Sequence, residues 1–448
     1  MQKGIVLRIF EASGLDQAVV YTLLSKGMQS ISGVVTLLLI ATQFSPEIQG
    51  YYYTFSSLLA LQSFVELGLY VVIVSRASHE WGKLRIDEVG NVIGDPSSIS
   101  RLASLVRFIA KWYAVVSTIF VLGAGYLGYI FLDQTPSNIS WRTQWWTVVS
   151  FAAVQLWLMP ILSLLEGCNQ VVALNRFRFM QAMLEAIVVW VLITAGVGLW
   201  VAVGSLAVKV AAILLFLAIK YYQFFQSLFS HPKLQKISWR DEIWPMQWRI
   251  GAQGLVNYFA LSLYTPVMFH YHGAKIAGQM GMTLQVIGVI QALGIAWIQT
   301  KVPQFGMLIS TRKYSQLDKV WWQASKRTLF FTFAGSIVFF GLMQILNNYG
   351  VGLVSRMVDA LPMILFLVAF ALAQIPNCQV AYLRAHAREP FLLVGTVGGL
   401  LIGGLVYVLG SRFGPTGAAA GYLVVICLFT IPFSTFIWFR RRAEWQIH

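Results

Sequence analysis

Long apolar runs separated by short polar connections dominate the chain from residue 17 to residue 439. A helix needs about 20 mostly apolar residues to cross the hydrocarbon core of a bilayer. We expect about twelve runs to do so, near 17–43, 47–75, 108–132, 146–168, 179–199, 201–219, 251–271, 276–300, 328–349, 360–383, 390–411 and 415–439. The pattern predicts an all-α integral membrane protein of about twelve transmembrane helices.

The composition agrees with a membrane environment. Of the 448 residues, 58% are hydrophobic and 11% are charged, whereas charged residues make up about 25% of an ordinary globular domain. A soluble protein this apolar would expose large hydrophobic patches to water. The net charge of +15 comes from Lys and Arg residues scattered between apolar runs, which favours a membrane surface over nucleic acid as the partner.

The cysteines and the missing motifs limit the chemistry. Cys168, Cys378 and Cys427 have neither the number nor the spacing of a disulfide framework or metal site. The sequence has no GxxxxGK[ST] phosphate loop, no HExxH and no GxSxG. We therefore expect no metal and no cofactor, and a transporter rather than an enzyme.

The distribution of Lys and Arg predicts the orientation. With the N-terminus in the cytoplasm, nearly all Lys and Arg residues of the connections fall on the cytoplasmic side, as the positive-inside rule requires. The opposite side holds only Arg142, Lys275, Arg356 and Arg412. A wrong number of spans would exchange inner and outer connections and destroy this separation, so we predict that both termini are cytoplasmic.

The connections repeat with the same rhythm in two halves of six spans. In each half a long basic stretch follows a short outer turn, at 76–107 and at 301–327, and we expect each stretch to form an amphipathic interfacial helix. Asp95-Pro96-Ser97 is a helix start signal in the first. Six spans in each half give both repeats the same orientation, with a central cleft between them. The predicted domains are an N-terminal six-helix lobe (1–228), a cytoplasmic linker (229–248) and a C-terminal six-helix lobe (249–448).

Charged residues inside the first-half spans are the main candidates for a functional site, because each costs about 2.5–3.5 kcal/mol at the bilayer centre. Lys26 and Glu66 lie at matching depths of neighbouring antiparallel spans, and we expect them to pair in a polar cleft. Gln62 shares a helix face with Glu66. The alternative is an ion pair that only fixes helix packing. Glu185 and Lys209 are expected at different depths, where Lys209 attracts an anion or extends to the outer interface.

The second half has amides and hydroxyls in place of deep charges. The cavity candidates there are Gln253, Asn257 and Gln291. Glu166, at the cytoplasmic end of the span near 146–168, is expected to have an interfacial or capping role. Pro160 and Pro376 lie inside spans and are expected to kink or weaken them.

Three stretches resemble a known family. Residues 45–52 (SPEIQGYY), continuing to 55–69 (FSSLLALQSFVELGL), are similar to the first hairpin of Wzx-like polysaccharide flippases. These belong to the multidrug/oligosaccharidyl-lipid/polysaccharide (MOP) exporter superfamily. Residues 165–170 (LEGCNQ) with Arg176 resemble the family's connection between spans 4 and 5, and 414–420 (GPTGAAA) resembles its start of span 12. With the plan of six plus six spans, the resemblance covers essentially the whole chain.

The resemblance implies a V-shaped pair of lobes with spans 1, 2, 7 and 8 facing the cavity. It also implies a function: flipping a polyprenyl-pyrophosphate-linked oligosaccharide, such as an O-antigen unit, across the bacterial inner membrane. Glycosyltransferases and a polysaccharide polymerase are the implied partners. Lys26 and Lys209 are the cations that such an anionic substrate would meet inside the membrane. The main alternative is a cation-coupled multidrug exporter of the same superfamily, and a second is a membrane glycan ligase or polymerase partner.

Overall fold

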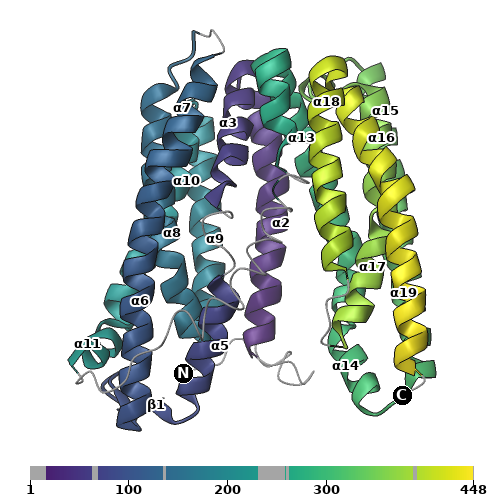
Figure 1. The fold of residues 1–448 in the computed structure, drawn as a ribbon. Helices are drawn as coiled ribbons and strands as arrows, with labels where there is room; N and C mark the ends of the chain where they lie inside the picture. Colours follow the sequence, from purple (N-terminus) through teal and green to yellow (C-terminus); the bar gives the residue numbers. More distant parts are fainter. Residues whose placement is uncertain are drawn as a thin grey trace, which may run out of the picture. The chain divides into compact units, whose positions relative to one another are not determined.

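Helices make up nearly all of the computed structural model, which describes residues 17–62, 69–134, 138–230, 258, 262–386 and 391–446. The chain divides into two compact units (Figure 1). Unit 1 contains Met1–Phe44 and Leu59–Gly254, and unit 2 contains Ser45–Leu58 and Leu255–His448. The short segment Ser45–Leu58 thus belongs to unit 2, although the chain on either side of it belongs to unit 1. No pattern in the sequence indicated this exchange.

Eight helices of the described ranges are long and apolar enough to cross a membrane. They are Pro96–Asp133, Arg142–Gly167, Val171–Thr194, Trp200–Lys220, Tyr264–Ser310, Tyr314–Asn348, Ala360–Arg384 and Leu393–Glu444. The fifth and the last, with 47 and 52 residues, are about twice as long as one crossing requires. The protein is therefore a mostly helical, multi-pass membrane protein. The number of twelve spans and the cytoplasmic termini stay predictions.

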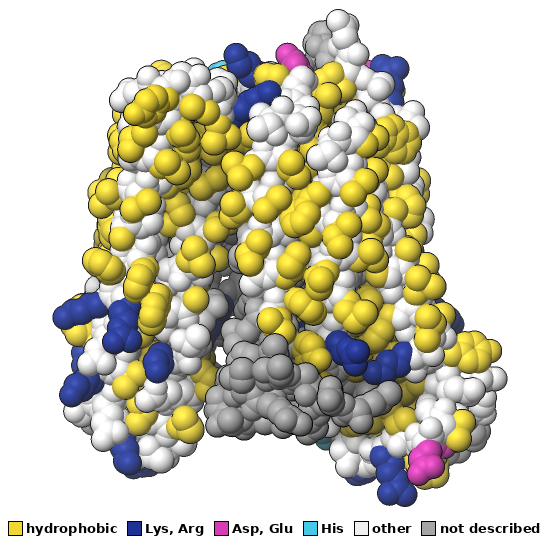
Figure 2. Space-filling model, turned by 180° about the vertical axis from the view of Figure 1, so that it is seen from behind, with side chains coloured by type: hydrophobic (Ala, Val, Ile, Leu, Met, Phe, Trp, Pro, Cys, Tyr) yellow, Lys and Arg dark blue, Asp and Glu magenta, His cyan; other side chains and the backbone are white. Residues whose placement is uncertain are grey.

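The surface of both units carries the side chains that a lipid environment requires. Large apolar residues such as Ile219, Ile337 and Leu428 are 82%, 70% and 73% exposed. Figure 2 shows hydrophobic side chains over the middle of each unit, and most Lys and Arg of this face below them. In water such a surface would drive aggregation, whereas lipid tails solvate it.

Unit 1 is built almost entirely of helices. Its elements are α2 (Gln17–Gln43), α5 (Leu69–Trp81), β1 (Leu84–Ile86), β2 (Val92–Gly94), α6 (Pro96–Phe120), the π-helix η1 (Val121–Gly125), α7 (Tyr126–Asp133), α8 (Arg142–Gly167), α9 (Val171–Thr194), α10 (Trp200–Lys220) and α11 (Tyr222–Ser230). The long helices pack pairwise, with α2 along α9, α5 and α6 on α8, and α10 on both α8 and α9.

The expected interfacial helix at 76–107 is wrong. Helix α5 ends at Trp81, and an antiparallel hairpin follows in which Leu84 pairs with Gly94 and Ile86 with Val92. The turn forms because Asp87 accepts the backbone N–H groups of Val89 and Asn91. These bonds, above all that from Asn91, lower the pKa of Asp87.

The helix start signal in the same stretch is confirmed. Asp95 is the N-cap of α6, and its carboxylate accepts the backbone N–H of Ser98 at 3.0 Å. The hydroxyls of Ser97 and Ser98 also donate to it, and the three bonds lower the pKa of Asp95 to about 2. From this cap α6 runs directly into the apolar run expected as a span, with no separate interfacial helix before it.

Unit 2 has a more broken series of helices. Its elements are α3 (Pro46–Leu59), α13 (Tyr264–Gln299), α14 (Val302–Ser310), α15 (Tyr314–Asn348), the 3-10 helix η3 (Val354–Arg356), α16 (Ala360–Leu372), α17 (Gln374–Arg384), α18 (Leu392–Val425), the π-helix η4 (Ile426–Thr430) and α19 (Ile431–Gln446). Of the stretch 301–327, only α14 is a separate short helix, because residues from Tyr314 onward already belong to the long α15.

Two glycines interrupt long helices of unit 2. Gly273 in α13 and Gly414 in α18 have φ of 85° and 61° and lie outside helical geometry, in a region that favours glycine. Beyond Gly414 the chain folds back on itself. A Cβ on Gly421 would touch Leu405, and one on Gly417 would lie 2.1 Å from the carbonyl oxygen of Leu409. The expected border between runs 390–411 and 415–439 therefore coincides with a helical hairpin.

The prolines act differently from each other. Pro160 lies within the continuous helix α8. Pro376 lies just after the break between α16 and α17 at Ala373. The helix breaks there because the ring nitrogen of Pro376 cannot donate to the carbonyl of Leu372, four residues earlier.

The run expected as one span at 47–75 is divided. Helix α3 ends at Leu59, a turn follows at 60–61, and α5 begins at Leu69. Glycines let α3 approach α13 closely: a Cβ on Gly50 would lie 1.9 Å from the carbonyl oxygen of Ala274, and one on Gly278 would lie 2.9 Å from the backbone nitrogen of Gly50. Such small-residue contacts bring helix backbones together where lipid provides no hydrophobic driving force.

Candidate functional site

An ion pair joins α9 and α10 inside unit 1. Lys209 Nζ lies 2.8 Å from Glu185 Oε1, and Ser205 Oγ donates to the same oxygen at 2.7 Å. The side-chain amide of Gln181 donates to the backbone oxygen of Lys209 at 3.1 Å. We call Gln181, Glu185, Ser205 and Lys209 the α9–α10 polar cluster. It presents a neutralised charge pair together with an amide and a hydroxyl.

The expectation that Glu185 and Lys209 lie at different depths is wrong. Glu185 precedes the last residue of α9, Thr194, by nine positions, and Lys209 follows the first residue of α10, Trp200, by nine positions. Two antiparallel helices that meet in a short turn place such residues at the same level, because each rises about 1.5 Å per residue. Lys209 is therefore not a free cation, and its charge is compensated.

Pairing makes these charges tolerable in the membrane. The side chains of Glu185 and Lys209 are 25% and 31% exposed. An isolated charge there would cost about 2.5–3.5 kcal/mol, whereas a hydrogen-bonded pair carries no net charge. The cluster can therefore offer hydrogen bonds to a polar ligand without placing a net charge in the bilayer.

The predicted pair Lys26 and Glu66 lies outside the described residues. The backbone of Lys26 is part of α2, but its side chain is not described, and neither is Glu66. Gln62 is half-buried and helical. The neighbouring part of α2 is fixed to α9, because Trp190 Nε1 donates to Thr36 Oγ1 at 3.0 Å. The pairing of Lys26 with Glu66 stays a prediction.

The amides of unit 2 take part in helix packing. Gln291 donates to the backbone oxygen of Phe370 in α16 at 3.2 Å. Gln285 accepts the hydroxyl of Tyr53 at 2.7 Å, and the amide of Gln49 donates to the carbonyl oxygen of Gly278 at 2.9 Å and to that of Arg356 at 3.1 Å. Gln291 was predicted to line a cavity, and here its amide joins two helices. Gln253 and Asn257 lie outside the described residues.

A second ion pair was missed by sequence reasoning. The Arg178 guanidinium donates to Glu166 Oε2 at 2.7 Å, and the Tyr70 hydroxyl donates to Glu166 Oε1 at 2.9 Å. Asn175 Oδ1 accepts a further bond from Arg178. Glu166 thus ties α5, α8 and α9 together near the α8–α9 turn. The available signal was Arg178, twelve positions after Glu166 across a tight turn.

The thiols are packed rather than reactive. Cys168 and Cys378 are buried and Cys427 is half-buried. Cys168 sits in the α8–α9 turn, where burial raises the pKa of its thiol. Within the described ranges, no group of His, Cys, Asp and Glu is placed to hold a metal ion.

Two cavities lie at the end of unit 2 that contains α14. The larger, of about 600 Å³, lies between α15, α17 and α19 and is mostly apolar. Trp321 and Trp438 stack on one side of it at 4.7 Å, and the Asp318–Arg442 pair borders it. The smaller, of about 390 Å³, lies between the end of α13, the start of α14 and α15. Its lining mixes basic and other polar side chains with apolar ones.

Comparison of the whole fold finds transporters of one superfamily. The chain is similar to the lipid II flippase MurJ in an inward closed conformation, with a TM-score of 0.65, 11% identity, and coverage of 93% of this chain and 87% of MurJ. It is similar to an inward-facing MATE family multidrug resistance transporter of the MOP superfamily, with a TM-score of 0.66, 12% identity, and coverage of 95% and 99%.

A further MATE multidrug transporter, DinF-BH, gives a TM-score of 0.61 at 12% identity over 94% of both chains. No family model matches the sequence, and no curated protein matches it. At these identities the likeness concerns the fold, and it extends over nearly the full length of each chain. The protein has the fold shared by the lipid II flippase MurJ and the MATE transporters of the MOP superfamily.

Proposed function

We propose that the protein is a flippase that moves a polyprenyl-pyrophosphate-linked oligosaccharide across the bacterial inner membrane. The cargo would be a repeat unit of O-antigen or another surface polysaccharide. Charge balance carries the proposal. Among the described residues, Glu185 is the only carboxylate in the middle of a span, and Lys209 neutralises it. An exporter of hydrophobic cations needs an uncompensated acid in its cavity, whereas a sugar head group needs hydrogen-bonding groups without net charge.

The fold supports a MOP-type transporter and accommodates both substrate classes. MurJ is described as a lipid II flippase, and the MATE structures as multidrug transporters. The rival proposal is therefore a cation-coupled multidrug exporter. The α9–α10 polar cluster favours the flippase, because Lys209 neutralises Glu185 and the cluster itself therefore offers no anionic site to a cationic drug. A membrane glycan ligase or polymerase partner is the third candidate.

The transport cycle proposed here is alternating access coupled to an ion gradient. The lipid tail would stay in the bilayer while the head group passes through a polar cleft between the lobes. Glu66 is the candidate switch, because protonation of its carboxyl would release Lys26 to meet the pyrophosphate. The roles of Lys26, Glu66, Gln62, Gln253 and Asn257 rest on the sequence alone.

Deletion of the gene tests the proposal. We expect surface polysaccharide to disappear and the lipid-linked unit to accumulate on the cytoplasmic side, while resistance to hydrophobic cations stays unchanged. Polysaccharide retained together with increased drug sensitivity would instead identify an exporter. Loss of polymer with the lipid-linked unit found on the outer side would identify a ligase or polymerase partner.

Complementation of the deletion with Glu66→Gln tests the coupling. The variant is expected to flip poorly and to lose its dependence on pH. Gln62→Asn, four positions earlier in the sequence, is the matched control and should retain the pH dependence. Full flipping by Glu66→Gln with an unchanged pH profile would exclude Glu66 as the switch.

A further inference from the structure

The smaller cavity of unit 2 combines two cations with polar side chains. It is lined by Lys301 and Arg327, by Thr300, Gln304 and Gln323, and by Trp297, Val320 and Ala324. No carboxylate of the described residues is part of this lining. The nearest acid along α15, Asp318, is bound to Arg442 and to the hydroxyl of Tyr382. We call this cavity the basic pocket.

Neither cation of the basic pocket is paired with an acid of the described residues. Lys301 and Arg327 form no ion pair with any carboxylate in the described part of the chain, whereas Arg101, Arg142, Arg178 and Arg442 all do. The Arg327 guanidinium lies over the Trp297 ring at 5.6 Å, and Trp297 stacks flat on Phe331 at 5.0 Å. This stack holds Arg327 in place while leaving its N–H groups available.

A helix N-terminus borders the same pocket. Lys301 is the N-cap of α14, Thr300 precedes it, and Gln304 lies in the first turn. The first-turn amides of a helix lack intrahelical acceptors, and the helix dipole is positive at that end. Lys301 also directly follows Thr300, the C-cap of α13, and a helix C-terminus favours a cation. Phe305, which is fully buried, anchors α14 in the core of unit 2 and so fixes this geometry.

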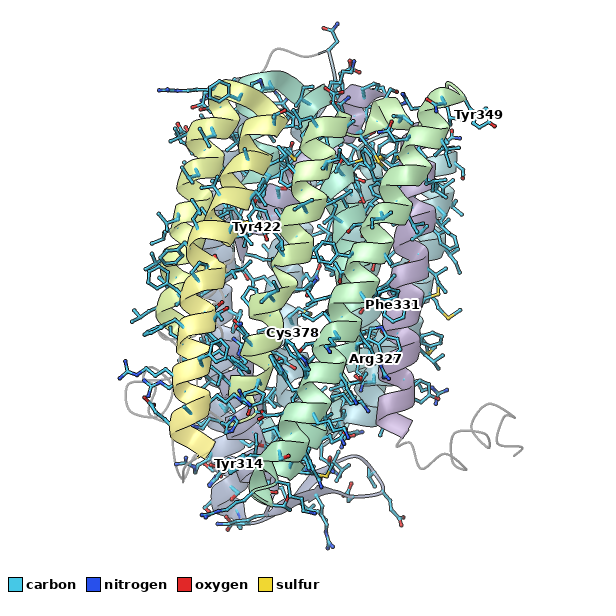
Figure 3. All side chains as sticks on the ribbon, turned by 90° about the vertical axis from the view of Figure 1, so that its right-hand side faces the viewer. Tyr314, Arg327, Phe331, Tyr349, Cys378 and Tyr422 are labelled. Carbon is cyan, nitrogen blue, oxygen red and sulfur yellow. The ribbon has the colours of Figure 1, made fainter. Side chains whose placement is uncertain are left out.

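The surroundings of the basic pocket indicate that the anion belongs to a lipid. Phe331 is 44% exposed, and Leu293 and Phe330 on the adjoining helices are 62% and 67% exposed. Figure 3 places Arg327 about one turn from Phe331 on α15, toward the Tyr314 end. The pocket therefore lies where charged side chains give way to the apolar surface. A phosphate in the pocket could have its hydrocarbon chains on that surface, with Trp297 at the interface.

We propose that the basic pocket binds the phosphate group of an anionic lipid from the leaflet that faces α14. The phosphate oxygens would accept hydrogen bonds from Lys301 Nζ and the Arg327 guanidinium at the N-terminus of α14. None of the residues assigned to the cargo in the proposed function lines this pocket. The lipid-binding proposal holds equally for a flippase and for a drug exporter, so its failure would leave the proposed function untouched.

Native mass spectrometry of the purified full chain tests this site. Micelles would contain phosphatidylglycerol or phosphatidylcholine at equal concentration. We expect retained phosphatidylglycerol on the wild type and little phosphatidylcholine. The double variant Lys301→Gln/Arg327→Gln should lose at least about tenfold in phosphatidylglycerol affinity, because charge-assisted hydrogen bonds to phosphate are removed.

The matched control removes two cations of the same region that do not line the pocket, Lys313→Gln/Lys326→Gln, and should retain the lipid. Unchanged thermal unfolding of both double variants would show that the fold is intact. Equal loss of lipid in both double variants would mean a nonspecific charge effect and would overturn the proposal, as would retention in the pocket variant.

Competition with inorganic pyrophosphate shows whether the bound phosphate belongs to a lipid or is free. Weak competition supports a lipid, and binding of pyrophosphate as tight as that of phosphatidylglycerol would overturn the lipid assignment.

Discussion

The intramembrane pair Glu185–Lys209 shows which residue-level facts a sequence contains. Both residue types were identified as candidates, because charge inside an apolar run is conspicuous. Their contact was missed because depth was counted from span ends whose positions are imprecise. Counting from the shared turn gives nine positions to each residue within α9 and α10. The α9–α10 polar cluster was therefore predictable once the turn at 195–199 was located.

Replacing one member of the Glu185–Lys209 pair should lower the free energy of unfolding more than replacing both. Glu185→Gln or Lys209→Met alone leaves an uncompensated charge in the span, and we expect each to lower stability by about 2–3 kcal/mol. The double variant Glu185→Gln/Lys209→Met should recover most of that loss. Unfolding of the four proteins in one detergent, analysed as a double-mutant cycle, measures the coupling. Additive effects would mean that the two side chains do not interact.

Amide side chains were harder to interpret from the sequence. That Gln291 lines a cavity stays a prediction, and the structure shows its amide donating to the backbone oxygen of Phe370. A span that is apolar on every side gives no periodic signal that separates a lipid face, a packed face and a cleft face. The partner is a carbonyl 79 positions away, which no local pattern indicates. Cavity residues of unit 2 were for this reason not predictable individually.

At the scale of elements, the sequence predicted where helices lie better than where they end. The apolar runs near 17–43, 146–168 and 201–219 correspond closely to α2, α8 and α10. The prediction for 76–107 failed because it treated a basic, polar segment as one helix. Asp87 and Gly90 build a turn there, and Leu84, Ile86 and Val92 alternate as a strand pair does. Turn chemistry outweighed the helical pattern.

The contact between α3 and α13 depends on the absence of side chains. Gly50→Ala would bring a Cβ to 1.9 Å from the carbonyl oxygen of Ala274, and we expect it to lower stability by about 1–3 kcal/mol. Gly341→Ala, in α15, meets open space and should stabilise by up to about 1 kcal/mol through helix propensity. The unfolding midpoints of both variants measure the difference. A Gly50→Ala protein as stable as Gly341→Ala would mean that α3 does not pack closely there.

At the scale of the whole molecule, charge gives an orientation that labelling can test. Lys313 and Asn348 are exposed at opposite ends of α15, at its N-cap and its last residue. In a background without native cysteines, Asn348→Cys should react with a membrane-impermeant maleimide in intact cells. Lys313→Cys should react only after the membrane is opened. The reverse pattern would invert the predicted topology.

Helix α3 has a consequence for how the gene can be divided. Residues 45–58 lie in the first part of the sequence but complete unit 2, where Gly50 fits against Ala274. A gene cut within the predicted linker 229–248 would produce a second fragment that lacks one of its own helices. Unit 2 would be complete only when the second fragment is expressed together with the first, which supplies α3. Two gene fragments cut at the linker therefore do not encode the two folded units.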